Sequence, residues 1–298
     1  MIATIIGCNG YIGKHLSLFL LAKKWSIFGY DLKECPFMSM TYYSPLDLVQ
    51  KNQVNEINTQ VDYIFYFSGI TGTSRGYDEY EQYIDINEKG LVHILDRMRD
   101  TKSKARIIFP STRLVYKGIK DVTLHENSDK EFKTIYALNK WFGEQVIQQY
   151  NDYFGIQYNI FRIGVPYGNL FDDVYSYGTI GSFLKKAREK KNIILFGSGE
   201  QKRTFTHVED ICLQIYNAIL HTSSKDHIYN IDGETFSLKE IAKKIATKYH
   251  VDIEYKGWIT MDEKIESGDT VFDAASIRKI ITNPLKNTFE RWLSEKKC

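Results

Sequence analysis

Near its N-terminus the chain reads Ile2-Ala3-Thr4-Ile5-Ile6-Gly7-Cys8-Asn9-Gly10-Tyr11-Ile12-Gly13, and this stretch decides the fold. A short apolar strand runs directly into a glycine loop, and the loop opens an amphipathic helix over 11–23. Such a loop presents helix amides and the positive end of the helix dipole to an anion. Gly7 would make the tight turn, Gly10 would let a pyrophosphate approach, and Gly13 would let helix and strand pack closely. The predicted contacts of a dinucleotide cofactor are Gly7, Asn9, Gly10, Tyr11, Ile12 and Gly13.

Outward from this loop, short apolar runs alternate with longer amphipathic stretches. The expected strands are 2–6, 26–30, 62–67, 106–109 and 157–161, and the expected helices are 11–23, 46–58, 80–99 and 134–153. This alternation predicts a Rossmann-type, doubly wound parallel sheet, an α/β fold with helices on both faces. Beyond Gly168 the pattern loosens into helices near 179–190, 208–220 and 237–248 and a strand at 193–196. We expect a dinucleotide-binding domain over 1–168 and 201–232 and a smaller α/β substrate lobe over 169–200 and 233–298.

The composition limits the classes of function. Among 298 residues, 39 Lys and Arg against 37 Asp and Glu give a net charge of +2, which does not favour binding to nucleic acid or a membrane surface. The longest apolar run, 18–22, is far shorter than the roughly 20 residues that span a bilayer. The cysteines and histidines lack metal-ligand spacing, and no signal-peptide pattern is present. We therefore expect a cytoplasmic protein with reduced thiols and no metal.

Two acidic residues follow expected strands near the glycine loop. Asp31 comes 18 residues after Gly13, where a carboxylate can accept hydrogen bonds from both ribose hydroxyls, although an ordinary turn also explains it. Its negative charge would repel the 2′-phosphate of NADP and therefore favours NAD. Lys33, two residues further on, leaves NADP as an alternative cofactor. Asp47 could bond the adenine amino group, and a helix N-cap explains it equally well.

The chemical signal is a tyrosine and a lysine on one face of the helix expected over 134–153. Tyr136 and Lys140 are spaced i, i+4, as are Tyr116 and Lys120. The second pair encloses Gly118 in an expected loop, whereas the first pair lies on a long amphipathic stretch. Position therefore favours Tyr136 and Lys140.

The chemistry of the favoured pair is proton transfer accompanying hydride transfer. A free tyrosine has a pKa near 10, and an ammonium about 4 Å away at an effective dielectric constant of about 20 can bring that pKa close to neutrality. Tyr136 would exchange the proton of a carbinol or carbonyl, Lys140 would favour the tyrosinate, and Thr112 would hydrogen-bond the substrate oxygen. A half-buried structural aromatic is the alternative for Tyr136.

With these residues placed, the sequence resembles the extended short-chain dehydrogenase/reductases, and among them the NAD-dependent epimerase/dehydratase family acting on nucleotide sugars. The likeness covers nearly the whole chain. Three more segments carry it: Asn87-Glu88-Lys89-Gly90, Arg162-Ile163-Gly164-Val165-Pro166-Tyr167-Gly168 and Arg203-Thr204-Phe205-Thr206-His207-Val208-Glu209-Asp210. The resemblance implies a nicotinamide cofactor and a nucleoside-diphosphate sugar as substrate.

The resemblance also implies residue roles. Arg203 would bind the substrate diphosphate, a role that suits its planar donor fork. Leu195 and Phe196 would lie near the base pocket. Further cofactor contacts would be Phe67, Ser68, Gly69 and Asn87, beside Tyr136 and Lys140, and the substrate contacts would be Thr112, Arg113, Val165, Phe196 and Arg203.

Departures from the family pattern narrow the reaction. Val165 stands where the family usually has Asn, and 259–270 lacks the Arg that often provides a second diphosphate ligand, a place that Lys264 could take. Leu114 stands where the family's dehydratases have an acid and GDP-fucose synthase has a Cys. Because Leu114 cannot titrate, the resemblance implies redox chemistry at C4 alone.

Three functions remain open from the sequence. We slightly favour a 4-ketoreductase, because Val165 implies a sugar pocket unlike that of UDP-galactose 4-epimerase. The alternatives are a nucleotide-sugar 4-epimerase with retained NAD and a non-catalytic dinucleotide-binding scaffold. The presence of Thr112, Tyr136 and Lys140 argues against the scaffold.

The helices expected over 80–99 and 134–153 also predict a homodimer. Leu138, Trp141, Phe142, Val146 and Ile147 give the second helix more apolar breadth than one sheet-facing stripe needs. Two such helices per subunit could form a four-helix interface. Burial beneath the second lobe is the alternative.

Overall fold

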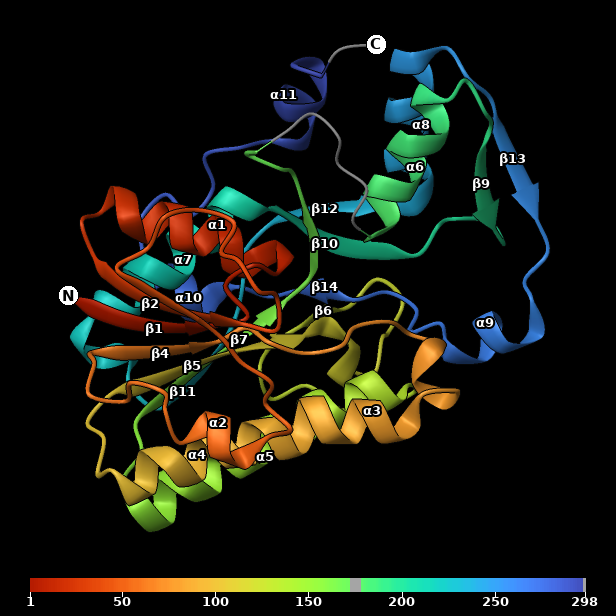
Figure 1. The fold of residues 1–298 in the computed structure, drawn as a ribbon. Coiled ribbons are helices and arrows are strands. Elements are labelled where there is room, and N and C mark those ends of the chain that lie inside the picture. The colour runs from red at the N-terminus through yellow and green to blue at the C-terminus, as the bar shows by residue number, and fades with distance from the viewer. Residues whose placement is uncertain (172–177, 297–298) are drawn as a thin grey trace.

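A computed structural model describes residues 1–171 and 178–296, and its centre is a seven-stranded parallel sheet (Figure 1). The strands are β1 (Ile2–Ile6), β2 (Ser26–Asp31), β3 (Tyr42–Pro45), β4 (Tyr63–Tyr66), β5 (Arg106–Thr112), β7 (Tyr158–Ile163) and β11 (His227–Asn230). They are ordered β11-β7-β5-β4-β1-β2-β3. The strand order reverses between β1 and β4, which is where ligands bind in such sheets. The structure therefore confirms the predicted Rossmann-type fold.

Helices cover both faces of this sheet (Figure 1). One face carries α1 (Tyr11–Ala22), α7 (Val208–Leu220) and α10 (Ala275–Arg278), and the other carries α2 (Lys51–Val54), α4 (Gly90–Asp100) and α5 (Ile135–Phe154). Successive strand residues point to opposite faces. Ile5 accordingly packs with Leu16 and Ile211 in one core, whereas its neighbour Ile6 packs with Ile94 in the other.

Two expected helices differ in the structure. The helix predicted over 46–58 is wrong except for α2, because Leu46 and Leu48 are buried at a spacing of two and the Asp47 side chain accepts a hydrogen bond from the Val49 amide. The helix predicted over 80–99 is present as three consecutive pieces. These are α3 (Tyr80–Ile84), a π-helical turn η2 (Asp85–Lys89) and α4.

A smaller group of elements lies beside the carboxyl ends of β1 and β4 and has its own apolar core. It contains α6 (Gly178–Arg188), α8 (Leu238–Tyr249), α11 (Phe289–Ser294), the pair β9 (Ile193–Phe196) and β13 (Ile253–Lys256), and the three-stranded sheet of β8 (Val165–Tyr167), β10 (Lys202–His207) and β12 (Glu234–Ser237). Leu184, Phe205 and Ile241 are completely buried in this core.

The remaining elements are short connections. They are β6 (Thr123–Leu124), β14 (Val271–Phe272), α9 (Thr260–Ile265) and the 3₁₀ turns η1 (Arg75–Tyr77), η3 (Arg113–Val115) and η4 (Thr222–Ser224). The division into two domains stays a prediction, and its substrate lobe includes 172–177 and 297–298, outside the described residues. Ala274, Ile277 and Ile281 pack in the core that contains β1, although they follow β14 in the chain.

Candidate active site

The glycine loop is folded tightly against the end of β4. The Gly7 amide donates to Tyr30 O at 2.7 Å, and Gly7 has a φ of +85°, which side chains rarely adopt. A Cβ at Gly13 would lie 2.0 Å from Gly7 O, so only glycine lets α1 begin this close to the loop. A Cβ at Gly10 would meet only Gly7 O within 4 Å, at 3.1 Å. The outer side of the loop at Gly10 is therefore an open cradle that fits a pyrophosphate.

Asp31 lies against this loop at the end of β2. Its Oδ2 accepts a hydrogen bond of 2.9 Å from the Asn9 amide, and its Oδ1 accepts one of 3.3 Å from Lys33 N. The carboxylate therefore lies beside the pyrophosphate cradle, where a dinucleotide places its adenine ribose. The Asn9 side chain is used elsewhere, because its Nδ2 donates to Cys35 O at 3.0 Å and its Oδ1 accepts from the Phe37 backbone amide at 2.7 Å.

A cleft of about 480 Å³ opens in front of the loop. Eight of the predicted cofactor contacts line it: Gly10, Tyr11, Ile12, Phe67, Ser68, Gly69, Tyr136 and Lys140. Four of the predicted substrate contacts line it as well: Thr112, Arg113, Val165 and Arg203. Six separate chain segments thus meet at one cavity. Gly7 and Gly13 shape the loop, Asp31 and Asn9 lie on its flank, and Asp47 and Asn87 are outside the lining.

Tyr136 and Lys140 enter the cleft from the first turns of α5. Thr134 is the N-cap of this helix, and its side chain accepts a 3.0 Å hydrogen bond from the Ala137 amide. The Lys140 Nζ lies 5.9 Å from the centre of the Tyr136 ring and 4.5 Å from that of Phe109. Burial lowers the pKa of Lys140 to about 8, although the Glu144 carboxylate opposes this change. The ammonium is thus held beside the tyrosine in a water-poor site.

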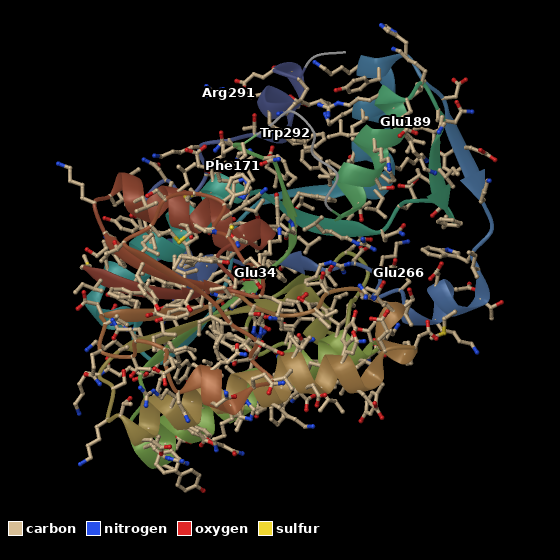
Figure 2. All side chains as sticks on the ribbon, in the orientation of Figure 1. Glu34, Phe171, Glu189, Glu266, Arg291 and Trp292 are labelled. Atoms are coloured by element: carbon tan, nitrogen blue, oxygen red, sulfur yellow. The ribbon has the colours of Figure 1, made fainter. Side chains whose placement is uncertain are left out.

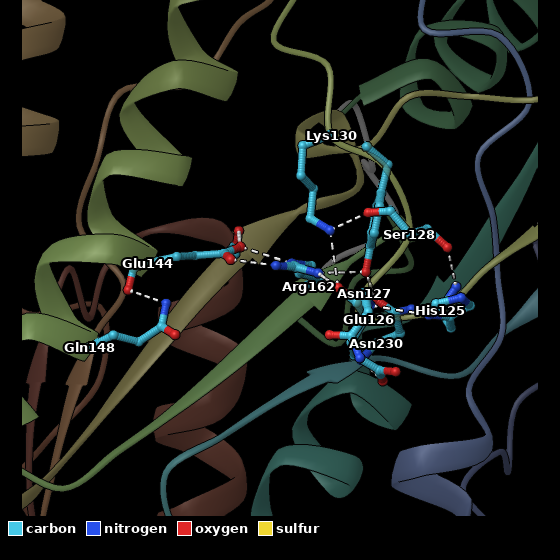
Figure 3. Close-up of polar contacts among 11 residues, drawn as sticks. His125, Glu126, Asn127, Ser128, Lys130, Glu144, Gln148, Arg162 and Asn230 are labelled. Carbon is cyan, nitrogen blue, oxygen red and sulfur yellow. Dashed lines mark hydrogen bonds and ion pairs between the residues drawn. The ribbon is translucent and has the colours of Figure 1, made fainter. Parts of the chain in front are cut away.

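A buried ionic network holds this part of α5 (Figure 3). Arg162 of β7 binds both carboxylate oxygens of Glu144, with Nε to Oε1 at 2.9 Å and Nη2 to Oε2 at 2.6 Å. Ser111 of β5 also donates to Glu144, and Arg162 donates to Glu126 O at 2.7 Å. The network joins α5 to β5 and β7, and so fixes the backbone that carries Lys140.

The competing pair of Tyr116 and Lys120 does not lie on a helix. Tyr116 is fully buried, donates to Asn230 Oδ1 at 2.7 Å and accepts from Arg162 at 2.7 Å. Its hydroxyl belongs to the network around Arg162. Tyr136 and Lys140, by contrast, line the cleft, and their catalytic role stays a prediction.

Asn87 acts on the chain after β4. Its Oδ1 accepts from the Ile70 amide at 2.8 Å, and its Nδ2 donates to Ile70 O at 3.0 Å. This pairing fixes the backbone next to Gly69, which lines the cleft. The predicted contact of Asn87 with a cofactor stays a prediction.

A second cavity of about 450 Å³ adjoins the cleft. The two cavities share Thr73, Arg113, Leu114, Gly178, Thr179 and Arg203. Leu195 and Phe196 line the second cavity, as does Trp258, whose ring lies 6.1 Å from that of Phe196. The lining of this cavity combines these apolar side chains with the guanidinium groups of Arg113 and Arg203, a combination that suits a nucleoside diphosphate.

Glu266 is a residue of this second cavity that the sequence pattern did not reveal. It lies between α9 and β14 (Figure 2), and both its carboxylate oxygens accept from Arg203 Nη2, at 2.9 and 2.8 Å. Burial acts to raise the pKa of Glu266, but Arg203 and Arg113 hold it below its ordinary value. Lys264, the expected substitute for a second diphosphate ligand, is exposed and outside the lining of this cavity.

In the loop after β4, Phe67 to Gly69 were predicted from the sequence, but Thr71, Gly72 and Thr73, which also line the cleft, were missed. The place of these residues after an expected strand was a usable signal, since the carboxyl ends of parallel strands surround ligands. Glu266 offered no such signal, because it is 63 residues from Arg203.

His207 has a structural position at the end of β10. It is the N-cap of α7, where its Nδ1 accepts from the Glu209 amide at 3.3 Å, and burial lowers its pKa to about 4. Within residues 1–171 and 178–296, no group of three or more His, Cys, Asp or Glu side chains could hold a metal ion. No helix in those ranges is long and apolar enough to cross a membrane.

Comparison with known proteins agrees with this geometry. Residues 3–232 match the NAD dependent epimerase/dehydratase family. The CDP-paratose 2-epimerase of Salmonella typhi is 25% identical, over 93% of this chain and 91% of that protein. The dTDP-4-dehydro-6-deoxy-D-allose reductase of Streptomyces bikiniensis is 23% identical, over 81% and 79%. The chain therefore belongs to the NAD-dependent epimerase/dehydratase family.

A solved structure shows the same fold over almost the whole chain. DesIV, the dTDP-glucose 4,6-dehydratase of Streptomyces venezuelae with NAD and TYD bound, superposes with a TM-score of 0.86 at 19% identity. The superposition covers 99% of this chain and 95% of that chain.

Proposed function

We propose that this protein is an NAD-dependent oxidoreductase that acts at C4 of a nucleoside-diphosphate sugar, and that it works as a 4-ketoreductase. One observation carries the proposal: Tyr136, Lys140 and Thr112 line the same cleft as Leu114 and Val165. The cleft thus combines a tyrosine acid/base with a nonpolar wall where a second acid/base would otherwise act.

The residues around the cleft fit a dinucleotide. The open backbone at Gly10 would hold the pyrophosphate, Asp31 the adenine ribose, and Phe67 to Gly69 would lie along the remaining length. When bound, the nicotinamide supplies hydride to a carbonyl carbon or accepts it from a carbinol carbon.

This chain's own residues would control the proton. Tyr136 would donate its hydroxyl proton to the C4 oxygen of a 4-keto sugar as the carbonyl is reduced. The Lys140 ammonium would stabilise the tyrosinate that remains, and Thr112 would hydrogen-bond the same sugar oxygen. Glu144 and Arg162 would keep Lys140 in place through the backbone of α5.

A nucleotide-sugar 4-epimerase with retained NAD is the second candidate. A UDP-glucuronate 4-epimerase among the relatives favours it, and in both reactions Tyr136 would exchange the proton of the C4 oxygen. They differ in stoichiometry, because a ketoreductase consumes one reduced cofactor per product and an epimerase consumes none. A scaffold would bind the cofactor without turnover.

Labelled cofactor tests the proposal. The protein would be incubated with NADH deuterated at C4 of the nicotinamide and with a panel of nucleoside-diphosphate 4-keto sugars. We expect one equivalent of NAD per product, with deuterium at C4 of the sugar by NMR. In a second assay with NAD and the 4-hydroxy sugar nucleotides, interconversion of the C4 epimers without net reduction of the cofactor would indicate the epimerase. Label at C2, the position in the Salmonella relative's name, would reject action at C4.

A further inference from the structure

Arg113 is a buried guanidinium that lacks a carboxylate partner. It directly follows Thr112, is 9% exposed, and donates from Nη1 to Ser267 Oγ at 2.7 Å and Thr270 Oγ1 at 3.0 Å. Among the residues that the structure describes, none forms an ion pair with it. A buried charge without a counter-ion is costly, so an anion from outside the chain is the expected partner.

Arg203 is the neighbouring guanidinium, and its charge is compensated by Glu266. The side chain is 6% exposed and binds the Glu266 carboxylate through Nη2, while its buried Nε makes no hydrogen bond within the described residues. Arg113, Arg203 and Glu266 together carry a net charge of +1. Because Arg203 is already paired, Arg113 supplies the uncompensated charge.

Both guanidinium groups lie where the cleft and the second cavity meet. In a nucleoside-diphosphate sugar, the diphosphate joins the sugar in one cavity to the nucleoside in the other. The Ser267 and Thr270 hydroxyls hold one end of the Arg113 fork, and its Nε and Nη2 make no hydrogen bond to described residues. These two donors suit a phosphate, which guanidinium groups bind in a bidentate manner.

We infer that Arg113 is a second diphosphate-binding residue, and that Glu266 occupies the position of the anion on Arg203 until the substrate binds. This inference rests on the proposed function for the class of substrate. It gives the diphosphate a cation from the end of β5, in a chain whose segment 259–270 contains no arginine. A diphosphate that takes the Arg203 Nη2 donor displaces Glu266, so the glutamate weakens substrate affinity.

Binding titrations with charge variants test this inference. UDP, dTDP, CDP and GDP, and the corresponding nucleosides, would be titrated by calorimetry into the NAD-loaded protein. We expect one diphosphate to bind at least about tenfold tighter than its nucleoside. Arg113→Met should weaken that diphosphate about tenfold or more and leave the nucleoside affinity unchanged, while Glu266→Gln should tighten the diphosphate severalfold.

Lys264→Met is the matched control, because it removes an exposed cation from the same segment outside the cavity. NAD affinity reports whether each variant is folded. The inference is wrong if Arg113→Met changes diphosphate affinity by less than about twofold, if Glu266→Gln weakens it, or if the wild type binds none of the four diphosphates. These readouts are independent of turnover, so a failure of C4 chemistry would contradict the proposed function and leave this inference standing.

Discussion

The Lys140 ammonium lies between two aromatic rings, 4.5 Å from the centre of Phe109 and 5.9 Å from that of Tyr136. Aromatic faces partly replace the water that burial removes from a cation. The Phe109 ring comes from the middle of β5, and the Tyr136 ring from the first turn of α5. The packing of α5 against the sheet thus places the Lys140 ammonium beside Tyr136.

Tyr136→Phe tests the acid/base assignment. The change keeps the ring beside Lys140 and removes only the hydroxyl, which we propose exchanges a proton with the sugar oxygen. We expect turnover to fall by about 10²-fold or more, with NAD affinity unchanged. Steady-state kinetics and a cofactor titration measure the two quantities, and unchanged turnover would reject the role of Tyr136.

Lys140→Met tests the cost of the buried ammonium. The pKa of Lys140 in the folded protein is about 8, below the ordinary value of 10.5, so burial of the charged lysine destabilises the folded state at neutral pH. Met fills a similar volume without charge, and we expect it to raise the free energy of unfolding at pH 7 by about 1–3 kcal/mol while turnover is lost.

The same pKa predicts a pH dependence of stability. Between pH 8 and 10.5 the unfolded chain holds a proton on Lys140 that the folded chain has released. Lys140 therefore makes the free energy of unfolding of the wild type increase with pH in this range. Lys140→Met should lack this increase in urea unfolding measured across the range. Parallel pH profiles for the two proteins would show that Lys140 keeps an ordinary pKa.

Asp31 predicts a preference for NAD. Its carboxylate lies beside the glycine loop, so the 2′-phosphate of NADP should lower affinity by about 1–3 kcal/mol, roughly tenfold or more. Asp31→Asn should narrow this difference. Equal or tighter binding of NADP by the wild type would overturn the assignment, and Lys33 would be the first residue to change.

The exposed face of α5 predicts a homodimer. Leu138 is 45% and Phe142 is 36% exposed, which argues against burial of these residues beneath the second lobe. Covering them with the same helix of a second copy would remove an apolar surface from water. Light scattering at micromolar concentration should give twice the chain mass, and Leu138→Asp should give the monomer. A monomeric wild type would contradict the prediction.

Leu114 predicts that no proton is exchanged at C3 or C5 of the sugar. Its alkyl side chain lines both cavities, and abstraction of a ring proton next to a ketone needs a positioned base worth about 10²–10⁴ in rate. Turnover in deuterated water, followed by NMR of the sugar, should show no deuterium at these carbons. Incorporation at the catalytic rate would reveal a base and reopen dehydratase or 3,5-epimerase chemistry.

Local spacing made much of this protein predictable. The spacing of Gly7, Gly10 and Gly13 predicts a strand, a turn and a helix, because few other backbone structures need glycine at these positions. The proximity of Tyr136 and Lys140 could be predicted as well, because residues four apart lie on one face of a helix. The non-helical segment 46–50 before α2 could not be predicted, because apolar residues near Leu46 fit two local structures. The contact of Arg203 with Glu266 could not be predicted either, since it depends on how distant segments fold together.

The packing of α10 has a consequence for synthesis of the chain. Ile277 and Ile281 complete the core around Ile5 of the first strand, although almost the whole sequence separates them. The core around β1 is therefore incomplete on the ribosome while the C-terminal segment is still being made. Until α10 emerges, the apolar surface that it covers is exposed to water and to chaperones.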